Sequence, residues 1–171
     1  MSKTSVIRNG ICVIAVFLFS ALGANAQRFA VSTDAVQWAI ASPNLGFEAV
    51  MAQHHALAFN ASIAPVKLIE KASIAHITIE PQYKYWFRMP FFGHYVGASM
   101  LYSSYDLTFG KTARVGNLVA ACADYGYSII LGRRWNLVPH VGVGIGADFA
   151  ETTKFVPLVA KIGVNIQLVV K

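Results

Sequence analysis

Six charged residues share one face of the alternating segments that make up most of this sequence, and they are its clearest candidates for chemistry. They are Glu48, Glu80, Lys84, Asp124, Asp148 and Lys161, with Asp34 and His140 expected to join them. Buried charges must be paired, because an isolated ion in an apolar interior is strongly unfavourable. We therefore predict a network of salt bridges, with Glu48 and Glu80 among the acids and Lys84 and Lys161 among the bases.

Other residue types that could do chemistry lack the spacing that it requires. His54 and His55 are adjacent, so on a strand they point to opposite faces and are not expected to share a metal ion. The run 142–146 reads G-x-G-x-G rather than the nucleotide-binding G-x-G-x-x-G. His76 and Thr78 come nearest to the His/Ser pair of membrane-embedded lipid enzymes. We find no nucleophile motif and no zinc spacing, and we expect neither an enzyme nor a bound cofactor or metal.

The first 26 residues have the organisation of a cleavable signal peptide. Two basic residues precede an apolar run over 11–22, and an Ala-Asn-Ala cleavage site ends at Ala26. Cleavage there makes Gln27 the new terminus. The apolar run is shorter than the roughly 20 residues of a spanning helix, so an uncleaved anchor is the less favoured alternative. We predict a signal peptide over 1–26 and an exported domain over 27–171.

The composition indicates either a very large core or a surface that faces lipid. The chain is 56% hydrophobic and 13% charged, whereas soluble domains are about 25% charged. After Gln27 no run of 18 apolar residues occurs, which argues against a membrane-spanning helix. The formal net charge of +6 is small and scattered, which argues against nucleic-acid binding.

Apolar and polar residues alternate with a period of two through the exported domain, which predicts strands. A tilted strand of roughly 9–11 residues crosses a bilayer, and a sheet in lipid must close on itself to pair its backbone. The predicted fold is therefore all-β, an eight-stranded antiparallel up-and-down transmembrane β-barrel. Pro81 cannot donate a ladder hydrogen bond, so a bulge or irregular register is expected there. The expected strands are 29–40, 44–52, 56–64, 75–87, 94–103, 118–131, 137–149 and 155–169.

The two faces of these strands differ in a way that favours lipid outside. One face carries large aliphatics, with aromatics near the strand ends, as in the girdles of membrane barrels; in the last strand this face is assigned to Val156 and Leu158. The other face is rich in small residues, which suits a crowded lumen. The small residues are Gly46, Gly97, Ser99, Gly126, Ser128, Gly142, Gly144, Gly146 and Gly163.

The connections predict an orientation for the barrel. The links 53–55, 88–93 and 133–136 are short and are expected on the periplasmic side. The longer links, 65–74 and 104–117, are expected outside. Their small excess of Lys and Arg could meet lipid phosphates, although ordinary solvated loop charges are the preferred interpretation.

Several segments resemble a known family. Pro43-Asn44-Leu45-Gly46-Phe47-Glu48 is similar to the P-N-L-G-x-E signature of domain-of-unknown-function family 3575. The segment 81–86 resembles its P-E-x-R-Y-W motif, with Gln82 and Lys84 as departures. The segments 93–97 and 134–137 also resemble its later blocks. The resemblance implies a small outer-membrane barrel of OmpA-like architecture and implies no activity.

We therefore expect a monomeric barrel in the outer membrane of a Gram-negative bacterium, with a structural or surface-interaction role. Its expected partners are outer-membrane lipids, lipopolysaccharide and, during insertion, the barrel-assembly machinery. The charged lumen is interpreted as a structural plug, with a gated or proton-conducting path as the alternative, because eight strands leave room for side chains but not for a channel. Two other functions stay open: a soluble exported β-barrel that binds a small apolar ligand, and a membrane-embedded lipid-modifying enzyme.

Overall fold

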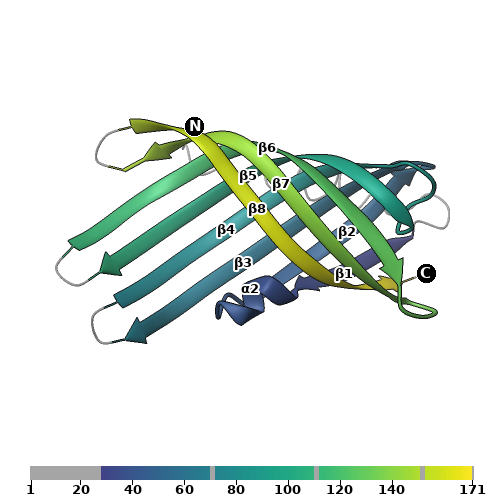
Figure 1. The fold of residues 1–171 in the computed structure, drawn as a ribbon, viewed down its shortest axis with the longest axis horizontal. Helices are drawn as coiled ribbons and strands as arrows, with labels where there is room; N and C mark the ends of the chain where they lie inside the picture. Colours follow the sequence, from purple (N-terminus) through teal and green to yellow (C-terminus); the bar gives the residue numbers. More distant parts are fainter. Residues whose placement is uncertain (1–27, 70–71, 110–111, 151–152, 171) are drawn as a thin grey trace, which may run out of the picture.

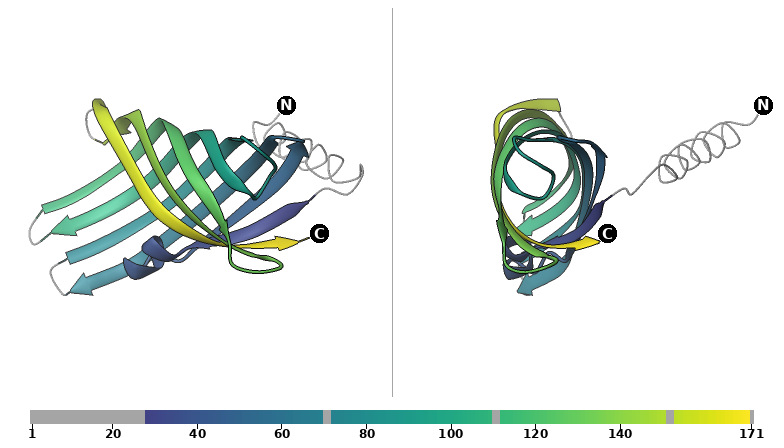
Figure 2. Two further views of the ribbon diagram at one scale, coloured as in Figure 1. Left: turned by 45° about the vertical axis from the view of Figure 1, so that its right-hand side comes forward. Right: turned by 90° about the vertical axis from the view of Figure 1, so that its right-hand side faces the viewer.

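The computed structural model describes residues 28–69, 72–109, 112–150 and 153–170, without the side chains of 65–74 and 107–114. The predicted signal peptide and its cleavage site at Ala26 and Gln27 lie outside these residues. Eight strands pair antiparallel in sequence order, and the last strand closes on the first (Figure 1). Figure 2 shows the closed ring almost end-on. The predicted eight-stranded up-and-down barrel is confirmed.

The barrel has two unlike ends. Phe29 and Val170 pair at one end, beside three connections between strands, and we call this the terminal end. The opposite end, where long hairpins extend, is the distal end (Figure 1). No helix in the described part of the chain is long and apolar enough to cross a membrane. The elements are β1 (Phe29–Asp34), α2 (Ala35–Ala39), β2 (Asn44–Ala52), β3 (His55–Ile69), β4 (Ala72–Trp86), β5 (Gly93–Phe109), β6 (Thr112–Ile130), β7 (Trp135–Phe149) and β8 (Thr153–Val170).

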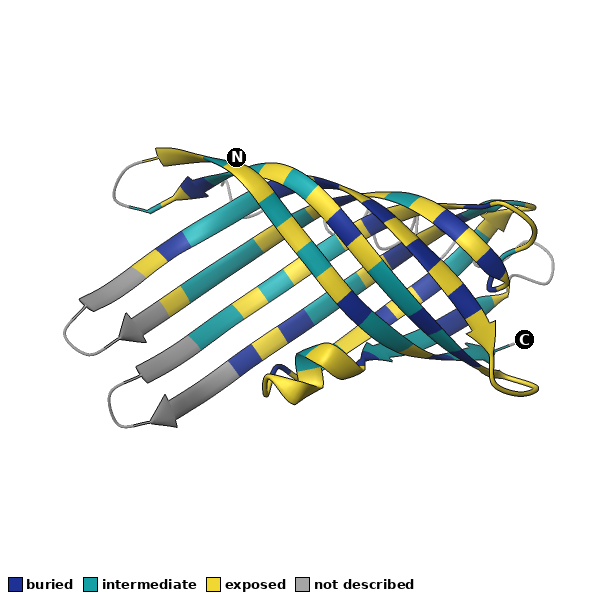
Figure 3. Cartoon of the chain, in the orientation of Figure 1, coloured by how far each residue is buried: buried dark blue, intermediate teal, exposed yellow. Residues whose placement is uncertain are grey.

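Successive side chains alternate between the lumen and the exterior, because neighbouring residues of a strand point to opposite faces. On β4, Lys84 and Trp86 are buried, whereas Tyr83 and Tyr85 are exposed. Figure 3 shows this alternation as bands on every strand around the barrel. Most large apolar side chains point outward, and Ile162 is 74% exposed. The predicted assignment of bulky apolar residues to the outer face is confirmed.

The central strands are longer than the sequence predicts. The prediction of long loops over 65–74 and 104–117 is wrong. β3 continues to Ile69, and β5 and β6 pair as far as Phe109 and Thr112. Polar residues such as Asp106 interrupt the apolar alternation that marks a strand. The ladder nevertheless continues, because every non-proline backbone supplies the same donor and acceptor.

The first strand is shorter than expected. β1 ends at Asp34, and a five-residue helix, α2, replaces the predicted strand 35–40. The Asp34 carboxylate accepts hydrogen bonds from the backbone N–H groups of Val36 and Gln37. This N-cap satisfies donors that begin a helix and would otherwise lack partners.

Two details of register also differ from expectation. Pro81 causes no bulge: the pairing of β4 with β5 stops after Ile79 and resumes at Gln82 in the same register. The pairing of β7 with β8 instead shifts between Gly144 and Gly146. Because of this shift, the residues at the start of β8 point to the opposite face from the one that strict alternation predicts. Val156 pairs with the inward-facing Gly146, so the assignment of Val156 to the outer face is wrong.

Candidate functional site

All six predicted charged residues lie on inward-facing positions, and the structure groups them along the lumen. The strands bring them in from β2, β4, β6, β7 and β8. Glu48, Lys84 and Asp124 are each at most 4% exposed. Two separate lysine-centred clusters form, one toward the terminal end and one further along the barrel.

The first cluster surrounds Glu48, whose carboxylate is fully engaged. Lys84 Nζ lies 2.8 Å from Glu48 Oε2. Trp86 donates its indole N–H to Glu48 Oε1 at 3.0 Å, and the Gln167 amide donates to Oε2 at 3.2 Å. The Lys84 ammonium also lies 4.7 Å from the centroid of the Tyr95 ring, a cation–π contact. The two ions neutralise each other, and three neighbours, Trp86, Gln167 and Tyr95, solvate this buried pair in place of water.

Three buried aromatic side chains pack together in the lumen between this cluster and the terminal end. We use the name terminal plug for Trp86, Phe91 and Tyr95, whose exposed fractions are 0%, 5% and 1%. The Phe91 ring packs against Trp86, and the Phe91 carbonyl accepts hydrogen bonds from Ser128 and Asn136. Gly126 faces Tyr95 across the ladder, where any Cβ would collide with the tyrosine ring.

The second cluster surrounds Lys161. Its ammonium pairs with Glu80 and lies 2.6 Å from Asp124 Oδ1. Lys161 also donates to Ser99 Oγ at 2.8 Å, and Ser99 in turn donates to Asp124 Oδ2 at 2.7 Å. One cation thus holds two carboxylates, so this cluster carries a formal charge of −1, whereas the Glu48–Lys84 pair is neutral.

The remaining predicted residues lie outside the two lysine clusters. His140 Nε2 lies 3.6 Å from Asp34 Oδ2, so the carboxylate that caps α2 also faces an imidazole. Asp148 accepts hydrogen bonds from the Tyr105 hydroxyl, at 2.7 Å to each oxygen. A small polar cavity of about 40 Å³ lies beside Glu80 and His140. A cavity of this size has room for ordered water.

The histidines outside the lumen form no metal site. His54 and His55 contact Trp86 O and the Tyr83 hydroxyl instead. The described residues contain no group of three His, Cys, Asp or Glu side chains close enough to hold a metal ion.

Sequence patterns did not indicate two features of the structure. The terminal plug depends on Phe91, which lies in a connection where no periodicity exists. Ser42 Oγ lies 3.2 Å from His76 Nε2, and these residues are 34 positions apart. Among the described residues no carboxylate contacts His76, and Ser42 is only 1% exposed.

The fold and the lumen define the class: a small antiparallel β-barrel with an apolar exterior and an ionic interior. Residues 11–161 match the family model described as "Protein of unknown function (DUF3575)", and the chain belongs to this family, as its resemblance predicted. Among solved structures, the chain is similar to the one described as "Crystal structure of Neisserial surface protein A (NspA)". The TM-score is 0.55 at 11% identity, over 83% of this chain and 94% of that one. No curated protein matches the chain.

Proposed function

We propose that this protein is an outer-membrane β-barrel of a Gram-negative bacterium, exported by the signal peptide 1–26, with a structural or surface-interaction role. The observation that carries the proposal is the inverted distribution of polarity. Large apolar side chains such as Phe155, Leu158 and Ile162 are 67–74% exposed, whereas Glu48 and Lys84 are 2% and 4% exposed. A water-soluble barrel has the opposite arrangement, whereas lipid favours an apolar outer band.

We propose that the side chains in the lumen act as a structural plug and not as an ion- or proton-conducting path. The terminal plug fills one end, and lysine–carboxylate clusters occupy the space behind it. Interior side chains fill the width of an eight-stranded barrel. We therefore propose that the protein acts as a monomer through its surfaces, with membrane lipids, lipopolysaccharide and the assembly machinery as its partners.

The two alternative functions have weaker support. A soluble barrel for an apolar ligand requires an apolar cavity, but the cavity beside Glu80 is polar and only about 40 Å³. A lipid-modifying enzyme requires an accessible nucleophile, but Ser42 is buried and its His76 partner contacts no described carboxylate. We propose no catalysis and no cofactor.

Replacing Ile162 by Lys tests the membrane assignment. Ile162 lies in the middle of β8 and faces outward. In a lipid bilayer, a lysine near the midplane of a barrel wall destabilises the fold by about 2–4 kcal/mol. In a soluble barrel, an exposed substitution of this kind changes stability by about 0.5 kcal/mol or less. Urea unfolding of the protein in phospholipid vesicles, followed by heat-modifiable gel mobility, measures the difference.

Leu131→Lys is the matched control, because Leu131 is 61% exposed but lies in the connection after β6. We expect its stability to match that of the unmodified protein. Equal, small effects of both substitutions would contradict the membrane assignment. Carbonate-resistant sedimentation with outer membranes provides an independent measurement.

A further inference from the structure

The terminal end of the barrel carries only positive formal charge on its described surface. Arg28, Arg88, Arg133 and Arg134 lie there, and its connections 53–54, 87–92 and 131–134 contain no Asp or Glu. The acidic residues of the chain lie elsewhere: in the lumen (Asp34, Glu48, Glu80, Asp124, Asp148), on β5 toward the distal end (Asp106), or outside the described residues (Glu70, Glu151). The arginines of this end therefore lack carboxylate neighbours on its described surface.

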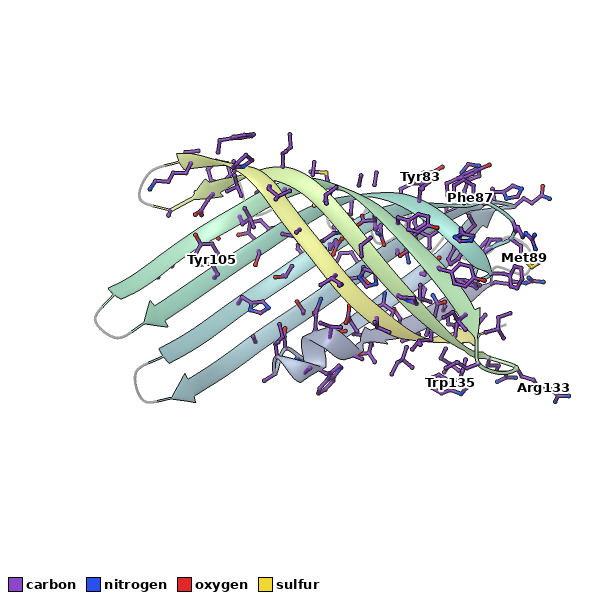
Figure 4. The ribbon with its side chains drawn as sticks, in the orientation of Figure 1. Tyr83, Phe87, Met89, Tyr105, Arg133 and Trp135 are labelled. Carbon is purple, nitrogen blue, oxygen red and sulfur yellow. The ribbon has the colours of Figure 1, made fainter. Side chains whose placement is uncertain are left out.

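One of these arginines borders a groove on the outside of the barrel. The groove has a volume of about 460 Å³ and is lined by Phe87, Arg88, Phe92, Gly93, His94, Tyr125 and Tyr127. Figure 4 shows Phe87 and Met89 at this end, with Arg133 and Trp135 at the neighbouring connection. The groove thus lies where the apolar outer wall of the barrel meets the arginines of the terminal end.

The polar groups of the groove suit an anion. The Arg88 guanidinium lies 6.0 Å from the Phe92 ring centroid and makes no ion pair with a described residue. His94 Nδ1 hydrogen-bonds the Tyr125 hydroxyl at 2.5 Å, so Nε2 of the same ring stays available to a ligand. A guanidinium binds phosphate oxygens in a bidentate manner. When the Tyr125 hydroxyl donates to His94 Nδ1, His94 Nε2–H is a further donor, and the Tyr127 hydroxyl at the same groove adds another.

The apolar part of the groove continues into the outer wall of the barrel. Val96 and Met100 follow His94 on the outer face of β5, 40% and 62% exposed, and Tyr125 is 46% exposed on β6. Aromatic side chains of this kind are enriched at the depth of lipid headgroups. A ligand with a phosphate at one end and acyl chains at the other matches both parts of this surface.

We propose that this groove binds the phosphodiester headgroup of an anionic phospholipid, with Arg88 as the principal phosphate ligand and the acyl chains along Val96 and Met100. The proposal rests on the proposed membrane location. It assigns the terminal end a specific lipid contact that is separate from the lumen and from any lipopolysaccharide contact at the distal end.

Native mass spectrometry of the intact barrel in detergent tests the proposal by titration with phosphatidylglycerol and, separately, with phosphatidylcholine. We expect one phosphatidylglycerol to bind in preference to phosphatidylcholine. A hydrogen bond to a charged group contributes about 1.5–3 kcal/mol, so Arg88→Gln should weaken phosphatidylglycerol binding by roughly tenfold or more. Arg133→Gln removes the same charge from the next connection and should leave the affinity unchanged.

Each other outcome overturns the proposal. Equal losses in the two variants would indicate diffuse attraction to the four arginines of this end. Equal binding of the two lipids would exclude a site selective for anionic phospholipids, because both lipids carry a phosphodiester and they differ in net charge. Displacement of the lipid by millimolar inorganic phosphate would assign the site to free anions. Gel mobility of both variants controls for folding, and the Ile162→Lys comparison tests the membrane location independently, so failure of either proposal is distinguishable.

Discussion

The lumen contains two lysine–glutamate pairs that lie in different surroundings: Glu48–Lys84 in the terminal half and Glu80–Lys161 further along the barrel. In the terminal half, the Glu48 and Lys84 side chains are 3% and 5% exposed, and Glu48 accepts hydrogen bonds from Lys84, Trp86 and Gln167. Further along the barrel, the Glu80 and Lys161 side chains are 15% and 13% exposed, and Glu80 lines a polar cavity. We therefore expect the Glu48–Lys84 pair to contribute more to stability than the Glu80–Lys161 pair, because water has less access to replace a lost partner.

The architecture explains why the Glu48–Lys84 pair is less exposed than the Glu80–Lys161 pair. At the terminal end, the connection between β4 and β5 folds inward, and Phe91 covers the mouth of the barrel. Toward the distal end, β1 stops at Asp34 and α2 takes its place in the wall. The polar cavity beside Glu80 is bordered mainly by short polar side chains.

The largest effect is expected from Glu48→Gln. This substitution keeps the size of the side chain but leaves the buried Lys84 ammonium without a carboxylate. Removing one partner of a buried ion pair destabilises a protein by about 3–5 kcal/mol. Urea unfolding, followed by tryptophan fluorescence, measures the loss because Trp86 contacts Glu48 directly.

The double variant Glu48→Met, Lys84→Met is the control for this prediction. Replacing both ions of a buried pair by apolar residues is often neutral or stabilising. We expect it to recover most of the stability that Glu48→Gln loses. A single variant as stable as the unmodified barrel would show that water reaches Lys84 and that the two halves do not differ.

A smaller loss is expected from opening the terminal plug with Phe91→Ala. Truncation of a buried Phe costs about 3–5 kcal/mol, and we expect the lower end of that range because the connection can close over the space. Phe91 has a φ of 67°, a backbone conformation that favours glycine. Phe91→Gly should therefore be more stable than Phe91→Ala by about 1 kcal/mol. Equal stabilities would show that the connection changes conformation once the ring is lost.

The sequence predicted the wall of the barrel better than its interior. Alternation identifies strands because one face points outward and the other into the lumen, and β2 has the expected bounds 44–52. The helix α2 was missed, although Asp34 is a good N-cap, because residues 35–40 also fit a strand pattern. The bulge at Gly144 depends on how β7 and β8 pair, which no single strand encodes.

The choice of ion partners could not be derived from single strands either. Glu48 on β2 meets Lys84 on β4 because both flank β3, where Ala58 faces Glu48 and is too short to separate them. Lys161 meets Glu80 across the lumen only once the barrel has closed. Such contacts depend on strand order and register together, whereas the sequence shows only which face each residue occupies.

Glu80→Gln is the exact counterpart of Glu48→Gln and is expected to have the smallest effect. Lys161 keeps its 2.6 Å contact with Asp124 and its hydrogen bond to Ser99, and the substitution leaves this cluster neutral. Because Lys161 keeps a carboxylate partner, the loss should be that of one hydrogen-bonded contact, about 1 kcal/mol in the same urea measurement. A loss as large as that of Glu48→Gln would mean that the distal lumen is as dry as the terminal half. The contrast between the two halves would then lie in their shape and not in their hydration.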